Sequence, residues 1–136
     1  MRLKLSILVA VSAHICTMPV AFILLFLPIY SGVASIDESG GLTQLAEVKL
    51  TLLEKSGISA LFVSGFPWIV TGVTLLSTIM GDSNRSDQLR VLWRWRSYSW
   101  GASLILFVFI CLSLDTVGLF YLPAFALSSI AAFLNK

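Results

Sequence analysis

Charged residues divide the chain into four long stretches that carry no charge. These stretches cover residues 5–36, 56–81, 97–114 and 116–135. A helix needs about 20 mostly apolar residues to cross the roughly 30 Å hydrocarbon core of a bilayer. The pattern therefore predicts four membrane-spanning helices, over about residues 5–30, 58–80, 97–114 and 117–134.

Small and polar residues recur at helical spacing within these predicted spans. In the first span they are Ser6, Ala10, Ala13, His14, Thr17 and Ala21, and in the fourth they are Ala124, Ser128 and Ala131. Residues three or four apart lie on one face of a helix, and small side chains there let helices approach closely in lipid. The pattern predicts a packed helix bundle.

The first apolar run resembles a secretory signal at its start, since Arg2 and Lys4 precede it. A cleaved signal has an apolar region of about 7–15 residues, and this run is far longer. We therefore expect residues 1–34 to be retained, with the first run serving as a span.

The segment between the first two spans has a mixed pattern. Glycines and acidic residues over 36–41 indicate a turn, and the polar residues of 42–55 except Lys49 then fall within one arc of a helix. A helix with one apolar and one polar face lies in the membrane interface. The sequence predicts an interfacial amphipathic helix over residues 42–55, with Lys49 reaching toward the headgroups.

The segment 81–96 is the most strongly charged part between apolar runs. It carries Arg85, Arg90, Arg94 and Arg96, with Trp93 and Trp95 among them. Short Lys/Arg-rich loops stay in the cytoplasm, and tryptophans gather at membrane interfaces. We expect a cytoplasmic loop here, with Ser86 capping a helix that runs directly into the third span.

The distribution of basic residues predicts the orientation. Seven of the nine lie in the N-terminal segment, the central loop and the C-terminus, whereas Lys49 and Lys55 lie in the first loop. By the positive-inside rule both termini and the central loop are cytoplasmic. We expect a multi-pass protein of the cell membrane, of the bacterial inner-membrane type.

Composition supports this class. The chain of 136 residues is 57% hydrophobic and 12% charged, against roughly 25% charged in soluble domains. The length indicates a single domain over 1–136. The net charge of +2 does not indicate a protein that binds nucleic acid. The fold class expected is therefore an all-α integral membrane protein, a bundle of four transmembrane helices with one interfacial helix.

Two ionisable residues near the predicted spans are candidates for chemistry. His14 lies near the middle of the first span, where it could relay protons, ligate haem with a second chain, or donate a hydrogen bond that holds helices together. Without a second histidine the packing interpretation is favoured. Asp115 lies in the turn between the last two spans, where we expect it to cap the fourth helix.

The remaining candidates point to binding rather than catalysis. Arg90, Arg94, Arg96, Trp93 and Trp95 could contact anionic lipid or an acidic partner, although interfacial anchoring also explains them. Cys16 and Cys111 form no metal-binding pattern, and no nucleophile or phosphate-binding motif is present.

We therefore expect a non-enzymatic accessory or scaffold subunit without a cofactor or metal. It would contact membrane lipids and form a homo- or hetero-oligomer with other membrane proteins. The alternatives are a small oligomeric transporter or channel with His14 in its pathway, and a haem-binding membrane subunit.

Overall fold

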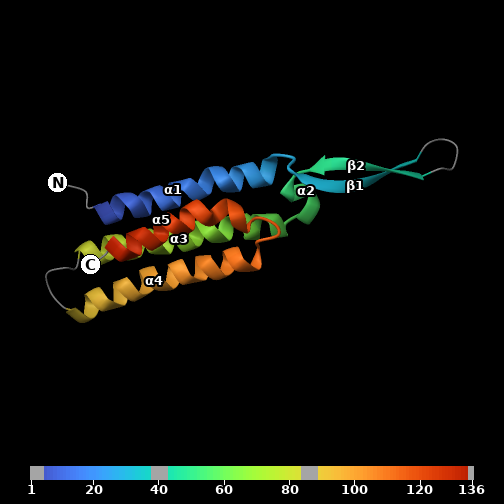
Figure 1. Cartoon of the computed structure of the whole chain (residues 1–136). Helices are drawn as coiled ribbons and strands as arrows, with labels where there is room; N and C mark the ends of the chain where they lie inside the picture. The colour runs from blue at the N-terminus through green and yellow to red at the C-terminus, as the bar shows by residue number, and fades with distance from the viewer. Residues whose placement is uncertain (1–4, 38–42, 84–88, 135–136) are drawn as a thin grey trace. The chain divides into compact units, whose positions relative to one another are not determined.

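The structure is a computed structural model that describes residues 5–37, 43–83 and 89–134 (Figure 1). Its elements follow in the order α1 (Leu5–Phe26), β1 (Tyr30–Asp37), β2 (Thr43–Leu50), α2 (Leu52–Ser56), α3 (Ser59–Ser83), α4 (Leu89–Leu112), the 3-10 helix η1 (Gly118–Tyr121) and α5 (Leu122–Leu134). They form two compact units, which are described separately. The helical unit comprises Met1–Val20 and Gly65–Lys136, and the hairpin unit comprises Ala21–Ser64.

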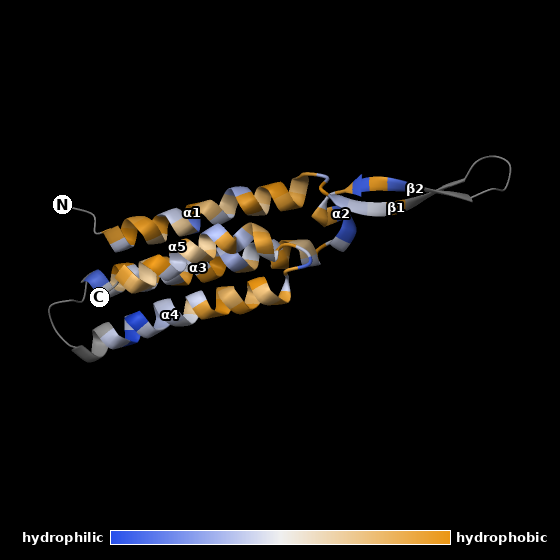
Figure 2. Cartoon of the chain, viewed as in Figure 1, coloured by the Kyte–Doolittle hydropathy of each residue, from blue (hydrophilic) through white to orange (hydrophobic). Residues whose placement is uncertain are grey.

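The chain is predominantly helical, as predicted. Within the described residues, three helical segments are long and apolar enough to cross a membrane: Leu5–Phe26, Ser59–Asp82 and Trp93–Leu112. The apolar helical segment Gly118–Leu134 is shorter. The first three predicted spans therefore correspond to observed helices, and their apolar residues dominate the hydropathy view (Figure 2).

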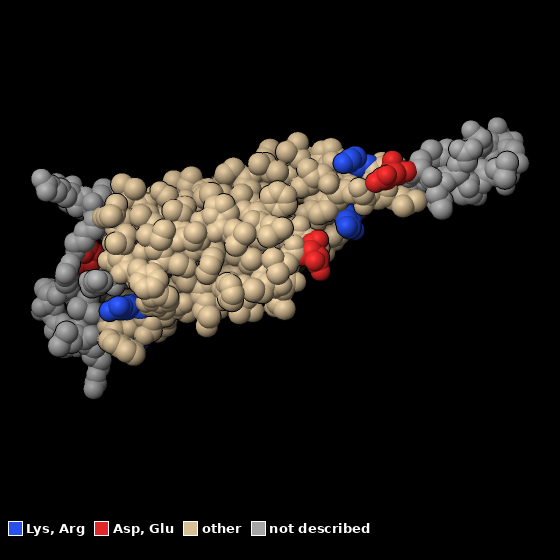
Figure 3. Space-filling model, in the orientation of Figure 1, with Lys and Arg blue, Asp and Glu red and all other residues tan. Residues whose placement is uncertain are grey.

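The helical unit has small residues inside and large apolar residues outside. The predicted stripe of α1 is buried at Ser6, Ala10, Ala13 and Thr17, and that of α5 is buried at Ala124, Ser128 and Ala131. Large side chains such as Ile15, Ile69 and Leu104 are more than half exposed. Figure 3 shows a broad surface of uncharged side chains over the helical unit. This arrangement suits a bilayer, because lipid solvates apolar side chains while small residues permit close packing.

Aromatic contacts align α4 and α5 as antiparallel neighbours. Trp100 contacts Phe133 with ring centroids 4.6 Å apart, Phe107 contacts Phe125 at 5.5 Å, and Phe109 contacts Tyr121 at 6.0 Å. Residue numbers rise along one helix as they fall along the other, which is the signature of an antiparallel pair. Figure 1 shows α5 running back beside α4.

The turn between α4 and η1 depends on Gly118. A Cβ atom there would lie 2.5 Å from the carbonyl oxygen of Ile110 and 2.9 Å from the carbonyl of Ser113. The Gly118 amide donates to the Ser113 oxygen at 2.7 Å. The prediction that Asp115 caps the fourth helix is wrong, because η1 begins after Val117 and has no side-chain cap.

The first loop corrects the sequence prediction. Residues 43–50, expected within the amphipathic helix 42–55, form strand β2, and only the short α2 is helical there. Strand β2 pairs antiparallel with β1, from Tyr30 opposite Leu50 to Asp37 opposite Thr43. The first span accordingly ends at Phe26 instead of residue 30.

Alternation along the two strands explains this pairing. By the register, Tyr30 and Gly32 share one face with Val48 and Leu50, whereas Ser31 and Val33 share the other with Glu47 and Lys49. When apolar residues alternate with polar ones, a strand places them on one face, whereas a helix would distribute the same residues around its surface.

The central charged segment is largely helical where the structure describes it. Helix α3 continues to Ser83 and α4 begins at Leu89, so much of the predicted loop 81–96 is helix. The expectation of a helix running directly into the third span is confirmed, since α4 is continuous to Leu112. The predicted cap Ser86 lies outside the described residues.

Candidate functional site

His14 contacts α3 through both its ring nitrogen and its ring face. Its Nδ1 lies 3.1 Å from the hydroxyl oxygen of Thr71. The imidazole stacks on the Trp68 indole, with the ring centroids 5.2 Å apart and the planes inclined by 24°. The residue is half-buried. These contacts place the sole histidine of the chain in the packing between α1 and α3.

The hydrogen bonds around Thr71 indicate which nitrogen of His14 carries the proton. The Thr71 hydroxyl lies 3.0 Å from the carbonyl oxygens of both Pro67 and Trp68, toward which its single proton can be donated. The hydroxyl oxygen is then an acceptor for Nδ1–H of His14. An imidazole that carries a proton on Nδ1 satisfies the Thr71 hydroxyl and the two carbonyls at once.

Gly72 provides the space for the His14 ring. A Cβ atom at Gly72 would lie 3.4 Å from Cε1 of His14. One turn along α1, the Thr17 hydroxyl donates to the His14 carbonyl oxygen at 2.7 Å, so it bonds within its own helix. The ring therefore fits between a glycine, an indole and a hydroxyl, as an interhelical packing residue would.

Sequence reasoning singled out His14 but missed its partners Trp68 and Thr71. Gly72 also lies against the imidazole. A lone histidine on one helix carries no information about which residues of another helix face it. That pairing depends on helix rotation, which small residues on several faces of α3 leave open.

The predicted basic and aromatic residues lie on the first turns of α4. Trp93, Arg94 and Arg96 are exposed, and Trp95 contacts Tyr98 edge to face at 5.7 Å. The side chain of Arg90 lies outside the described residues. Because α4 turns by 100° per residue, Arg94 and Arg96 point in nearly opposite directions. The helix thus places Arg94 and Arg96 on opposite sides, as their spacing in a helix predicts.

Arg96 belongs to a hollow with two tryptophans. This cavity of about 530 Å³ is lined by Trp93, Arg96, Ser97 and Trp100. An arginine between indole rings at the end of an apolar helix is typical of an interfacial anchor.

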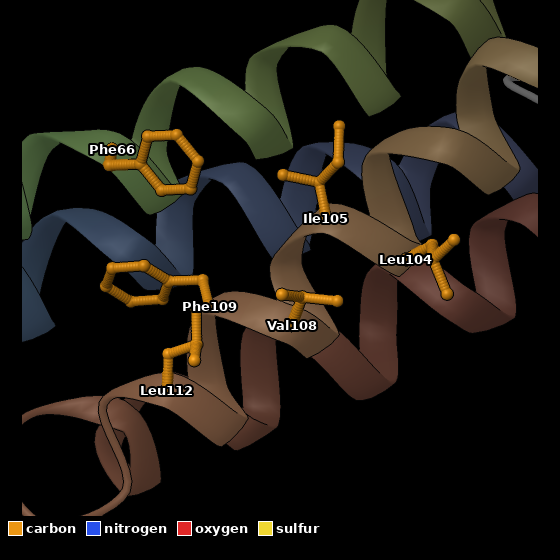
Figure 4. A pocket seen from close by; sticks show the side chains of 6 residues that line it. All are labelled: Phe66, Leu104, Ile105, Val108, Phe109 and Leu112. Atoms are coloured by element: carbon orange, nitrogen blue, oxygen red, sulfur yellow. The ribbon is translucent and has the colours of Figure 1, made fainter.

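Two further hollows lie along the adjoining surfaces of α3 and α4. One of about 210 Å³ is lined by Ile69, Val70, Val73, Ser97, Tyr98, Gly101, Ala102 and Ile105. The other, of about 280 Å³, is lined by Phe66, Leu104, Ile105, Val108, Phe109 and Leu112 (Figure 4). Phe66 reaches from α3 toward Phe109 of α4, and their ring centroids are 5.3 Å apart. Ile105 lines both hollows, and the two adjacent hollows are together called the α3/α4 groove.

The described residues contain no group of three or more His, Cys, Asp or Glu side chains that could hold a metal ion. Cys16 and Cys111 are free thiols. Comparison with protein-family models, with curated proteins and with solved structures finds no match for the chain.

Proposed function

We propose that this protein is a non-enzymatic accessory or scaffold subunit of a membrane assembly. Four segments would cross the bilayer, and both termini would be cytoplasmic. The hairpin of β1 and β2 would then stand on the non-cytoplasmic side, where it would contact a partner protein.

The length of the last helical segment is compatible with a fourth crossing. Four residues of η1 rise about 2 Å each and thirteen of α5 about 1.5 Å each, which gives roughly 28 Å. The hydrocarbon core is roughly 30 Å thick. The antiparallel contacts with α4 support a crossing that returns the chain to the side where α4 begins.

The β1–β2 hairpin is the observation that carries the proposal. It forms a sheet of two strands within the described residues, so each strand has one edge without a neighbouring strand. An isolated two-stranded hairpin is marginally stable in water, and unpaired edges are templates for an added strand. A partner that adds a strand would satisfy these backbone groups, which is a recurring mode of recognition.

The contacts of His14 favour this function over transport. Its Nδ1 and one ring face are occupied by Thr71 and Trp68. A proton relay needs a chain of exchangeable groups leading to and from the imidazole. The hydroxyls beside it, Thr17 and Thr71, donate their protons to backbone carbonyls of their own helices, and the Thr71 oxygen accepts from Nδ1.

The test compares hairpin variants with a His14 variant in the purified native assembly. Val33→Lys combined with Val48→Lys puts charges on both strands at exposed positions, and charged side chains discourage strand addition. We expect this pair to abolish stoichiometric co-purification of a membrane partner, while His14→Gln retains it. The opposite result, with the partner retained by the lysine pair and a transport activity lost in His14→Gln, would support the transporter alternative.

A further inference from the structure

We propose that the α3/α4 groove binds one anionic phospholipid. An acyl chain would lie in the groove, and the phosphate would be held by Arg94 at the cytoplasmic end of α4. This inference uses the membrane orientation proposed above, but it does not depend on a protein partner.

The shape of the groove suits a single acyl chain. Its lining on α4 extends from Ser97 to Leu112, a rise of about 22 Å at 1.5 Å per residue. One leaflet of hydrocarbon is about 15 Å thick, half of the roughly 30 Å core. The groove is therefore long enough to hold a chain through the depth of one leaflet.

Gly101 keeps the α3/α4 groove open near Tyr98. It lines the hollow beside Tyr98 and Ala102, and a Cβ atom built on it would meet no atom within 4 Å. A glycine in the middle of a helix lowers helix stability by roughly 1 kcal/mol relative to alanine in water. Gly101 is not needed to avoid a clash, so the open space that it leaves is available to a ligand.

Arg94 supplies charge at the end of this apolar surface. Arg94, Tyr98, Ile105 and Leu112 follow one another by four or seven residues, which places them on one stripe of α4. The Arg94 side chain is exposed, and it forms no ion pair with any described residue. A guanidinium binds phosphate oxygens through two parallel hydrogen bonds, and the Tyr98 hydroxyl can donate a third.

The size of the hollows argues against a partner helix as the occupant. Their volumes are about 210 and 280 Å³. A helix is about 10 Å across, so a 22 Å length would occupy on the order of 1,700 Å³. A slender chain with one anionic end fits both the volume and the charge, whereas a helix would have to rest outside the groove.

Native mass spectrometry of the purified full chain in detergent, with added phosphatidylglycerol or phosphatidylcholine, tests the proposal. We expect one phosphatidylglycerol per chain to be retained in preference to phosphatidylcholine. Arg94→Gln should weaken phosphatidylglycerol binding about tenfold or more, because it removes a charge-assisted contact. Gly101→Leu should weaken binding of both lipids by filling the groove.

Matched variants distinguish this site from general membrane charge. Arg96→Gln removes an equal charge on the other side of α4, and Gly65→Leu adds the same side chain on α3 at a glycine with open space that lines neither hollow. Both should retain lipid as the unaltered chain does. Equal weakening by Arg94→Gln and Arg96→Gln, or full retention by Gly101→Leu, would overturn the proposal. A protein partner that cross-links to a probe at Ile69 would also overturn it, if Gly101→Leu released that partner and left phosphatidylglycerol binding unchanged.

Discussion

The imidazole of His14 stacks on the indole of Trp68, with 5.2 Å between the ring centroids and 24° between the ring planes. This contact and the hydrogen bond to Thr71 join residues that are more than fifty positions apart in sequence. Because of these contacts, replacing His14 should have one effect if the residue packs helices together and another if it relays protons or binds a metal.

Replacing His14 separates packing from proton or metal chemistry. If the ring serves packing, His14→Gln and His14→Asn should keep most of the function, since an amide can still donate to Thr71. His14→Leu should lower bundle stability by about 1 kcal/mol, the scale of interhelical hydrogen bonds in membranes. Unfolding in mixed micelles would measure the change. Equal loss of activity in all three variants, or a haem absorption band in the purified protein, would contradict the packing role.

Gly72 should tolerate alanine but not a large side chain. A Cβ atom there is in ordinary contact with the His14 ring at 3.4 Å, whereas a longer side chain must displace the ring. We expect Gly72→Ala to leave stability nearly unchanged and Gly72→Leu to lower it by about 1–3 kcal/mol through overpacking. Gly65→Leu is the matched control, because the surroundings of Gly65 are open. Equal unfolding midpoints for the two leucine variants would show that Gly72 does not make space for His14.

Gly118 should be among the least replaceable residues of the chain. The atoms that a Cβ would meet are backbone atoms of Ile110 and Ser113, which cannot rotate away. We expect Gly118→Ala to lower stability by roughly 2 kcal/mol or more, within the range for disrupted backbone geometry. Gly101→Ala, where space is open, should have no such cost. Thermal unfolding in detergent would report both, and a similar small effect of the two changes would argue against the tight turn.

Glu54 should make the start of α2 sensitive to acid. The Thr51 backbone N–H donates to the Glu54 carboxylate at 2.8 Å and the Thr51 hydroxyl donates at 2.9 Å, and these bonds lower the pKa of Glu54. A carboxyl whose folded pKa is depressed stabilises the fold above its unfolded pKa, and that contribution is lost as pH falls through the folded pKa. The NMR shift of the Thr51 amide should therefore titrate at a pH below that of an ordinary glutamate. Glu54→Gln should remove this titration, and its persistence would assign it to another group.

Cysteine labelling tests the orientation. On a background without Cys16 and Cys111, Val33→Cys should react with an impermeant thiol reagent from outside, because Val33 is 70% exposed on β1. Ser83→Cys, at the end of α3, should react only after permeabilisation, since the positive-inside rule assigns the side with the following arginines to the cytoplasm. Labelling of Ser83→Cys from outside would show that the orientation is the opposite of the one predicted.

The helices were predictable because lipid imposes a simple pattern. Long uncharged runs gave the three long helices, and helical spacing of small residues gave the buried stripes of α1 and α5. The hairpin was missed for two reasons. Strand β1 follows the apolar residues of α1 without a charged boundary, and the residues of β2 fit a helical arc as well as an alternation. Only the pairing of β1 with β2 decides whether residues 43–50 form a strand or a helix.

The candidate site was predictable only in part, since the sequence gives a residue but not its neighbours. His14 stood out by its chemistry, while Trp68 and Thr71 resemble many other residues of a span. The separation of Arg94 from Arg96 was predictable, because it follows from the helix that the sequence predicts after Ser86.

Four hydroxyl groups of helix α3 donate hydrogen bonds within the helix itself. The hydroxyls of Thr71, Thr74, Ser77 and Thr78 all donate to carbonyl oxygens three or four residues earlier in the same helix. A hydroxyl satisfied in this way does not need another helix to leave water. The segment can thus enter the bilayer singly during synthesis, before its neighbours arrive, and the order in which the helices assemble is left to the shapes of their surfaces.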